Sequence, residues 1–196
     1  MGRPATDKRQ RLVTAAIEQF HRNGYARTSL ADVAKAAGLS AGNVFYYFKA
    51  KDDLARAVID AWCARLVGYL TDLDCETDHW RRIAGFINQA RVMREFYVTL
   101  GCPLAGLTSD LRREGDALKG EVARIYGVQL QWLATQFAQG GFSSAVAEKY
   151  SRELMTQYHG AILLAYTQED TSFIEHEATR LEDWLQQVRD GFVQKS

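Results

Sequence analysis

One continuous stretch, residues 28–54, constrains the fold more than any other part of the chain. It reads T-S-L-A-D-V-A-K-A-A-G-L-S-A-G-N-V-F-Y-Y-F-K-A-K-D-D-L. Ser29 is a residue type that caps helix N-termini, and Asp32, three residues later, can return the hydrogen bond. Gly38 follows the last apolar residue of that helix, where the backbone must turn through positive φ. Ser40 can then cap a second helix, and two short helices joined by so tight a turn predict a helix-turn-helix.

The small and apolar residues of this stretch fit the same interpretation. Ala34 lets two helices approach closely, Gly38 makes the turn, and Val44 fixes the second helix to the core. Val44 and Phe48 lie four residues apart and are expected to face inward. These two residues are therefore not assigned to a binding surface.

Composition extends the helical prediction to the whole chain. Of its 196 residues, 47% are hydrophobic, which is enough for a packed core. There are two prolines, and no apolar run approaches the roughly 18 residues of a membrane span. The first residues lack the apolar core of a secretory signal, so a cytoplasmic protein is expected.

Apolar periodicity and capping signals predict an all-α protein of about nine helices. The expected helical segments are 6–23, 30–37, 41–48, 51–70, 79–100, 103–113, 116–139, 144–167 and 172–192. The predicted domains are a helix-turn-helix domain over 1–50 and a larger helical regulatory domain over 51–196.

The formal net charge of zero hides an uneven distribution. Residues 1–56 hold ten Lys/Arg against five Asp/Glu, and the rest of the chain holds 14 against 19. A chance imbalance among solvated faces would give the same count. Together with the helix-turn-helix, the basic first part indicates contact with a polyanion.

The same residues resemble the DNA-binding signature of the TetR family of bacterial transcriptional regulators. That signature is roughly T-T/S-x-x-D-I-A-x-x-A-G-V-S-x-G-x-x-Y-x-Y-F-x-x-K-x-x-L, preceded by I-x-x-F-x-x-x-G-Y. The matching residues are Ile17, Phe20, Gly24, Tyr25, Thr28, Ser29, Asp32, Ala34, Ala37, Gly38, Ser40, Gly42, Tyr47, Phe48, Lys51 and Leu54. Phe45 departs from it, because the family usually has Tyr there. The resemblance covers about the first 56 residues and implies a homodimer that binds double-stranded operator DNA.

A recognition helix reads base edges with residues near its N-terminus. Asn43 can form a bidentate contact to adenine, and Ala41 and Phe45 can touch a thymine methyl group. Hydroxyl and ammonium groups nearby are candidates for phosphate contacts. Tyr47 could equally be a packed ring, and the serines cap helices with or without DNA. The predicted DNA-binding residues are Thr28, Ser29, Ser40, Ala41, Gly42, Asn43, Phe45, Tyr46, Tyr47, Lys49 and Lys51.

The resemblance also implies that the second domain binds a small molecule that releases the DNA. Helices there carry more aromatic residues than a minimal core needs, which indicates an apolar pocket for an apolar or aromatic inducer. Each residue taken alone could simply be core, and Arg91 or His159 could supply polar contacts. The candidate ligand residues are Phe86, Met93, Phe96, Tyr97, Cys102, Tyr126, Trp132, Tyr158, His159 and Tyr166.

Cys102 supports an alternative, because it begins a predicted helix in a Gly-Cys-Pro break, where the helix dipole lowers a thiol pKa. It could sense electrophiles or oxidants and act on the same DNA switch, or simply fill a tight break. The three cysteines lack metal-site spacing. No phosphate loop, metal cluster or nucleophile motif supports an enzyme, and no cofactor is expected. An architectural DNA-binding protein would not need the acidic second part.

Two apolar stripes near the C-terminus predict a dimer interface. Residues on the last helix recur at spacings of 4 and 3, which is a heptad pattern. Because a two-fold dimer suits a DNA-binding protein, these stripes are assigned to pairing with a second copy. In a monomer, both stripes would instead face inward. The assigned residues are Tyr150, Leu154, Tyr158, Ile162, Ile174, Ala178, Leu181, Leu185 and Val188.

Overall fold

The computed structural model describes residues 5–114 and 118–193, and helices are the regular elements within these two ranges. They are α1 (Ala5–Asn23), α2 (Leu30–Ala36), α3 (Ala41–Tyr47), α4 (Lys51–Leu73), α5 (His79–Val92), α6 (Arg94–Leu100), α7 (Pro103–Arg113), α8 (Lys119–Gln139), α9 (Ser144–Gln168) and α10 (Ser172–Val193). The all-α prediction is confirmed. None of the described helices is both long and apolar enough to cross a membrane.

The chain forms two compact units. Unit 1 comprises Met1–Arg65 and Pro103–Ile125, and unit 2 comprises Leu66–Cys102 and Tyr126–Ser196. Helices α4 and α8 contribute residues to both units. Unit 1 therefore contains α7 as well as the helix-turn-helix. The division into functional domains at residues 50 and 51 stays a prediction.

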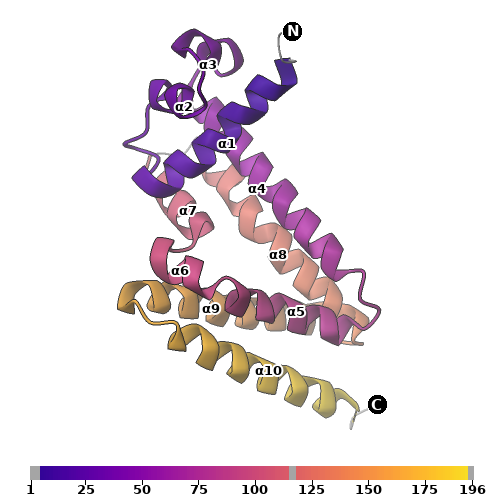
Figure 1. Ribbon diagram of the computed structural model, residues 1–196. Coiled ribbons are helices and arrows are strands. Elements are labelled where there is room, and N and C mark those ends of the chain that lie inside the picture. The colour runs from indigo at the N-terminus through magenta and orange to yellow at the C-terminus, as the bar shows by residue number, and fades with distance from the viewer. Residues whose placement is uncertain (1–4, 115–117, 194–196) are drawn as a thin grey trace. The chain divides into compact units, whose positions relative to one another are not determined.

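Unit 1 is built on α1, which packs against α2, α3 and α7 (Figure 1). Leu12, Ala16 and Phe20 lie on one side of α1 and are at most 4% exposed. Gly24 ends the helix at φ 81°, and its N–H donates to the carbonyl of Phe20. The predicted end of the first helix at residue 23 is confirmed.

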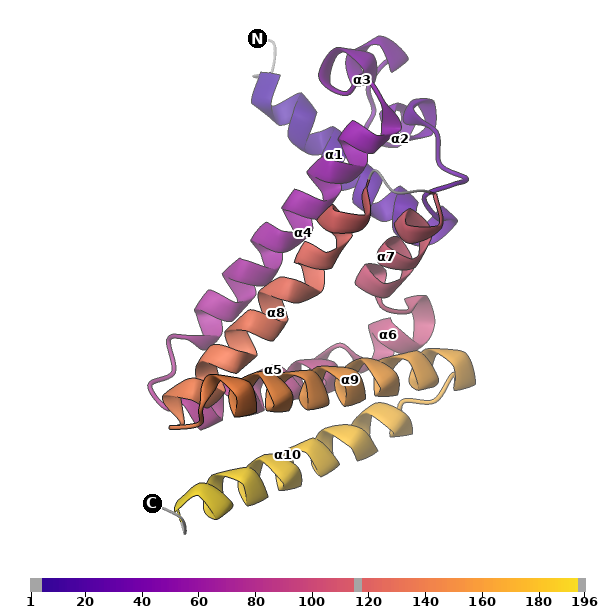
Figure 2. The ribbon, with the colours of Figure 1, turned by 180° about the vertical axis from the view of Figure 1, so that it is seen from behind.

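Unit 2 is centred on α9, with α10 lying side by side with it and with α5, and α6 against α9 (Figure 2). Its core is formed by large apolar residues such as Phe86, Phe137 and Leu154, all at most 2% exposed. Ser151 is the exception on α9, because it is buried and its hydroxyl donates to the carbonyl of Leu130, 2.7 Å away.

The two C-terminal stripes lie in this core, and their assignment to a dimer interface is corrected. Seven of the nine residues are at most 6% exposed within a single chain: Leu154, Tyr158, Ile162, Ile174, Ala178, Leu181 and Leu185. Tyr150 and Val188 are partly buried against the same core. The heptad spacing on α10 serves packing against α5 and α9 of the same chain, so its residues are not a free surface for a second copy.

The single helix predicted over 79–100 is divided at Met93 into α5 and α6. Met93 leaves helical geometry at φ −97°, ψ 6°, while its N–H still donates to Gln89 and its carbonyl accepts from Tyr97. The described residues therefore form ten helices instead of about nine. The predicted start of the segment 116–139, at residue 116, lies outside the described residues.

Arg91 ties α5 to α10 by a group of charged contacts. Its guanidinium donates to both carboxylate oxygens of Glu182 and to the hydroxyl of Thr179, and it lies 3.3 Å from Glu175. The Arg91 side chain is 20% exposed. A bidentate guanidinium–carboxylate pair is among the stronger charge-assisted contacts. The suggested ligand role of Arg91 is therefore replaced by a role in holding two helices together.

Replacing Arg91 should destabilise the protein more than replacing a comparable surface arginine. We expect Arg91→Met to lower the free energy of unfolding by about 1–2 kcal/mol, because Glu175 and Glu182 lose their shared partner. Arg152→Met is the control, since Arg152 is exposed and pairs with Glu148 on its own helix, and it should change stability by less than about 0.5 kcal/mol. Urea unfolding followed by circular dichroism gives both values, and equal losses would contradict the assignment.

Candidate nucleic-acid interface and ligand site

The first helix of the helix-turn-helix begins with a complete capping box. Ser29 has extended backbone geometry, its hydroxyl accepts from the N–H of Asp32 at 3.1 Å, and the Asp32 carboxylate accepts from the N–H of Ser29 at 2.9 Å. The hydrogen bonds from Ser29 lower the pKa of Asp32. This reciprocal arrangement is the one that the sequence predicted.

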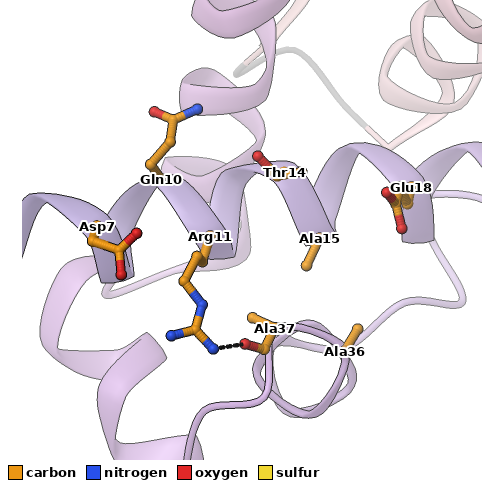
Figure 3. Close-up of a pocket in the computed structure, with 8 residues that line it drawn as sticks. All are labelled: Asp7, Gln10, Arg11, Thr14, Ala15, Glu18, Ala36 and Ala37. Carbon is orange, nitrogen blue, oxygen red and sulfur yellow. Dashed lines mark hydrogen bonds between the residues drawn. The ribbon is translucent and has the colours of Figure 1, made fainter. Parts of the chain in front are cut away.

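The turn between α2 and α3 depends on Gly38. Its φ of 64° lies in the left-handed region, and the next N–H, that of Leu39, returns to the carbonyl of Ala34 at 2.9 Å. Arg11 braces this turn from α1, because its guanidinium donates to the carbonyl of Ala37 at 2.6 Å (Figure 3). A Cβ at Gly38 would lie 3.3 Å from that guanidinium. Glycine is therefore needed for the backbone geometry, and a side chain there would also press on the Arg11 guanidinium.

Arg11 also lies in a polar cleft between α1 and the end of α2, with a volume of about 290 Å³ (Figure 3). The carboxylates of Asp7 and Glu18 line it as well. Sequence reasoning missed Arg11 as a brace, since 26 residues separate it from Ala37. Arg11 follows a run of polar residues on α1, and nothing in that run sets it apart as a residue that contacts the turn.

Helix α3 has one buried side and one exposed side. Val44 and Phe48 are 0% and 2% exposed, whereas Phe45 and Tyr46 are 50% and 73% exposed. Ala41 and Gly42 are exposed too. Tyr46 and Tyr47 meet edge to face with ring centres 4.9 Å apart. Neighbouring exposed aromatic residues on a small helix indicate an interaction surface.

Asn43 is held by Ser40 at the start of α3. The carboxamide nitrogen of Asn43 donates to the Ser40 hydroxyl at 2.8 Å. Ser40 stands at the predicted N-cap position with extended backbone, but within the described residues its side chain makes no capping hydrogen bond to α3. Because a carboxamide has two N–H donors and an acceptor oxygen, Asn43 keeps a donor and an acceptor for a base edge.

Thr28 was predicted to contact DNA, but its side chain is buried in the structure. Its side chain is 2% exposed, and its hydroxyl donates to the carbonyl of Gly24 at 2.9 Å. In this position the hydroxyl stabilises the loop after α1. The prediction that it contacts a phosphate is therefore corrected.

The two lysines differ in their surroundings. Lys49 is exposed at the end of α3, where its ammonium donates to the carbonyl of Phe45. Lys51 is half-buried: its ammonium donates to the carbonyl of Ala26 at 3.1 Å and lies 4.1 Å from the centre of the Tyr25 ring. Burial lowers the pKa of Lys51. Lys49 is therefore the freer of the two for a phosphate.

Tyr25 joins three segments of unit 1. Its hydroxyl donates to Asp52 at the start of α4, and its backbone N–H donates to Asp110 on α7, 2.8 Å away. Burial first, and then the hydrogen bond to Asp52, raise the pKa of Tyr25. A Cβ at Gly24 would lie 3.0 Å from the same Asp110 oxygen. Asp110 was not foreseen, because 85 residues separate it from Tyr25.

Six of the candidate ligand residues form one connected aromatic cluster in unit 2. The Phe86 ring lies 5.1 Å from Tyr158 and 6.0 Å from Trp132. The His159 ring lies 5.2 Å from Tyr158 and 4.9 Å from Tyr126. The Tyr158 hydroxyl donates a hydrogen bond to that of Tyr97. We refer to these six residues, together with Tyr69 near Phe86, as the aromatic cluster.

The other candidate ligand residues have different positions. Met93 lies at the break between α5 and α6, and Phe96 meets Tyr97 edge to face at 5.9 Å. Cys102 is half-buried and packs against the core of unit 2. Tyr166 is 46% exposed and lies against the backbone at Gly101. Tyr166 is thus at the surface, apart from the buried part of the cluster.

His159 differs from the other polar residues of the aromatic cluster in the hydrogen bonding of its ring. Among the described residues, neither ring nitrogen has a hydrogen-bond partner, although both are buried. Burial alone lowers the pKa of His159 from 6.5 to about 4. The ring is therefore neutral at pH 7, with one nitrogen able to donate and the other able to accept.

These features define a class of protein: a helix-turn-helix DNA-binding regulator with a second, helical unit. A profile of bacterial regulatory proteins of the tetR family matches residues 12–58, and a profile described as transcriptional regulator LmrA/YxaF-like, C-terminal domain, matches residues 83–180. The chain belongs to the TetR family of transcriptional regulators.

Named relatives match this chain over a short stretch. The chain is 37% identical over 57 residues to the HTH-type transcriptional regulator TtgR of Pseudomonas putida, a match that covers 29% of this chain and 27% of TtgR. It thus spans about a quarter of that relative. A 22% identity over 179 residues links it to an uncharacterized HTH-type regulator of Lactococcus lactis, covering 85% and 87% of the two chains.

Solved structures match over nearly the whole length and show the fold. A TetR regulator from Legionella pneumophila superposes with a TM-score of 0.78 at 19% identity, covering 96% of this chain and 99% of that one. Reduced NemR of E. coli superposes with a TM-score of 0.80 at 17% identity, covering 90% and 96%.

Replacing Thr28 should change stability without changing phosphate contacts. Thr28→Val removes the donor to the Gly24 carbonyl, so we expect the free energy of unfolding to fall by about 1 kcal/mol. Its affinity for DNA, measured by fluorescence anisotropy, should stay as in the parent chain. Lys49→Ala is the contrasting variant: it should weaken binding and lower the slope of log affinity against log salt by about 1. Weaker DNA binding by Thr28→Val would restore its role at a phosphate.

The buried, neutral His159 should make the protein less stable in acid. In the unfolded chain the ring takes up a proton below its ordinary pKa of 6.5, whereas in the folded chain it does so only near 4. Stability contributed by the neutral ring is therefore lost as pH falls through this window. Between about pH 7 and pH 5 the loss amounts to ~2 kcal/mol. His159→Gln should remove this part of the pH dependence in urea unfolding curves, and an unchanged dependence would contradict the assignment.

Proposed function

We propose that the protein is a homodimeric repressor that binds operator DNA through α3 and is released by a small molecule bound in unit 2. The observation that carries the proposal is the exposed part of α3, where Phe45 and Tyr46 reach solvent and the Asn43 carboxamide is oriented by Ser40. Family membership supports DNA binding, and release by an inducer is typical of the family.

In this mechanism, the N-terminal part of α3 enters the major groove. Asn43 pairs with adenine, using the N–H and the oxygen that Ser40 leaves available. Phe45 contacts a thymine methyl group, which compensates for the hydroxyl that it lacks. Tyr46 and Lys49 contact phosphates on either side. Lys51 acts indirectly, by keeping the loop before α2 in place.

A second copy supplies the symmetric half of the operator contact. Because the heptad stripe is buried, the dimer surface has to come from other residues. Leu163 and Leu164 on α9 are 62% and 48% exposed, and Phe173 at the start of α10 is 36% exposed. Apolar residues that are exposed close together indicate a protein contact, and we assign the dimer surface to this part of the two helices.

The inducer binds at the aromatic cluster and acts on the spacing of the two α3 helices. Aromatic rings with a small number of polar groups are typical of small-molecule sites. No specific observation supports the alternative in which Cys102 is a sensor of electrophiles or oxidants, because Cys102 is half-buried against the core. Ligand binding without covalent chemistry is therefore the favoured form of regulation.

The proposal predicts that Asn43 discriminates between DNA sequences. We expect Asn43→Ala to weaken binding to the DNA upstream of its own gene by about 1–3 kcal/mol, with little change for scrambled DNA. Lys49→Ala should weaken both alike, because phosphates carry no sequence information.

Fluorescence anisotropy titrations with both DNAs measure these changes. If Asn43→Ala lost the same binding free energy on both DNAs, the role of Asn43 in base readout would be refuted. Binding of the parent chain to both DNAs with equal affinity would instead identify an architectural protein.

A further inference from the structure

The edge of the aromatic cluster contains polar atoms for which the fold provides no partner. Both ring nitrogens of His159 are buried and, throughout the described residues, neither has a hydrogen-bond partner. Buried polar groups are nearly always paired with protein, water or ligand, so this ring is available to a bound molecule that completes its hydrogen bonds. One of its nitrogens offers a donor and the other an acceptor.

Gln129 is a second, independent case on the neighbouring helix. Its side chain is 4% exposed, and its amide nitrogen has no partner within the part of the chain that is described. Gln129 follows Tyr126 by three residues on α8, which places the two on one side of that helix. Because the Tyr126 ring contacts the His159 ring at 4.9 Å, Gln129 lies one helical turn from the same edge of the cluster.

Aromatic rings border the imidazole on two sides. Tyr126 from α8 meets it at an interplanar angle of 86°, and Tyr158 from α9 meets it at 74°. Tyr158 and Phe86 are buried, whereas Tyr126 and His159 are partly exposed. The imidazole therefore lies between the buried and the partly exposed rings of the cluster, although its two nitrogens are themselves buried. A planar molecule inserted beside it would meet aromatic rings and polar atoms together.

The groups around this edge are uncharged at neutral pH. The pKa of His159 is lowered by burial, with no charged group contributing in the described chain. The residues that act on Tyr158 are Tyr69, Tyr97 and Cys102. Arg91 and Arg94, which belong to the same unit, are paired with glutamates of α10. A charged ligand would lose its hydration here without gaining a counter-charge.

We propose that the inducer is an uncharged, planar aromatic molecule that carries both a hydrogen-bond donor and an acceptor, and that His159 and Gln129 receive this polar group beside Tyr126. The inference rests on the proposed function, because it names the ligand class of the same regulatory site. It excludes carboxylates and amines as the group that His159 recognises.

Three probes of nearly equal shape test the ligand class: 2-naphthamide, 2-naphthoate and 2-naphthamidinium. Isothermal titration of the full-length protein in the absence of DNA should show binding of the amide. The anion and the cation should bind at least about tenfold more weakly, because each places a charge beside neutral groups. Equal or tighter binding of either charged probe overturns the inference, and so does failure of the amide to bind up to its solubility limit.

Two variants test the role of His159. His159→Phe keeps an aromatic ring but removes both nitrogens, so the Kd for the amide should rise about tenfold. His176→Phe is the matched control, since His176 is exposed on α10, and its Kd should equal that of the parent chain. An unchanged Kd for His159→Phe overturns the inference.

The parent chain gives a measurement that does not depend on a variant folding. The ¹⁵N resonances of the His159 ring, identified by their absence in His159→Gln, should shift when the amide is added. Resonances that stay in place despite amide binding overturn the assignment of the site.

Release of operator DNA is measured separately, by anisotropy in the presence of the amide. Amide binding that leaves the DNA bound would uphold the ligand class and refute release by an inducer. Release of DNA by a charged molecule with no shift at His159 would uphold the repressor mechanism and refute this site.

Discussion

The surface of α3 that we propose for DNA reading depends on the burial of Val44 and Phe48. These two side chains are at most 2% exposed, and they fix the rotation of α3 about its own axis. Because α3 contains only seven residues, it is too short to be stable alone and takes its stability from this packing. Any rotation that exposed Val44 would bury Tyr46 and move Asn43 away from the exposed side. The rotation of α3 thus determines both which residues pack into the core and which residues are exposed.

The loop around Tyr25 adds a second constraint on the same unit. Its hydroxyl holds Asp52 at the start of α4, its N–H is held by Asp110 of α7, and Lys51 covers its ring. The segments that meet here come from the helix-turn-helix and from residues 103–113, the helix that directly follows Cys102 in sequence. A change in the position of α7 would therefore act on the loop that precedes α2. This gives the repressor mechanism a specific contact through which release could operate.

The sequence predicted features that depend on residues close together in the chain. Ser29 and Asp32 lie three apart, so their capping box follows from local geometry, and Gly38 marks its turn because few other residues accept positive φ. Arg11 and Asp110 escaped prediction because their partners are 26 and 85 residues away. The heptad spacing on α10 predicts contact with a second copy, but the same spacing also occurs on a helix face that is buried within one chain. The sequence alone does not separate these two cases. The break at Met93 interrupts a helix whose apolar pattern continues across it.

Charge is used differently in the two units, and this difference limits what each can bind. In unit 1, exposed Lys49 and the aromatic residues of α3 face outward, where a polyanion can reach them. In unit 2, Arg91 and Arg94 are paired with glutamates of α10, so they stabilise helix packing instead of attracting ligands. What remains at the aromatic cluster is a set of neutral donors and acceptors. His159 shows the cost of this arrangement, because a ring that stays neutral down to about pH 4 makes the fold less stable in acid. A site that gives up stability for an unpaired imidazole is best explained by a ligand that completes its hydrogen bonds.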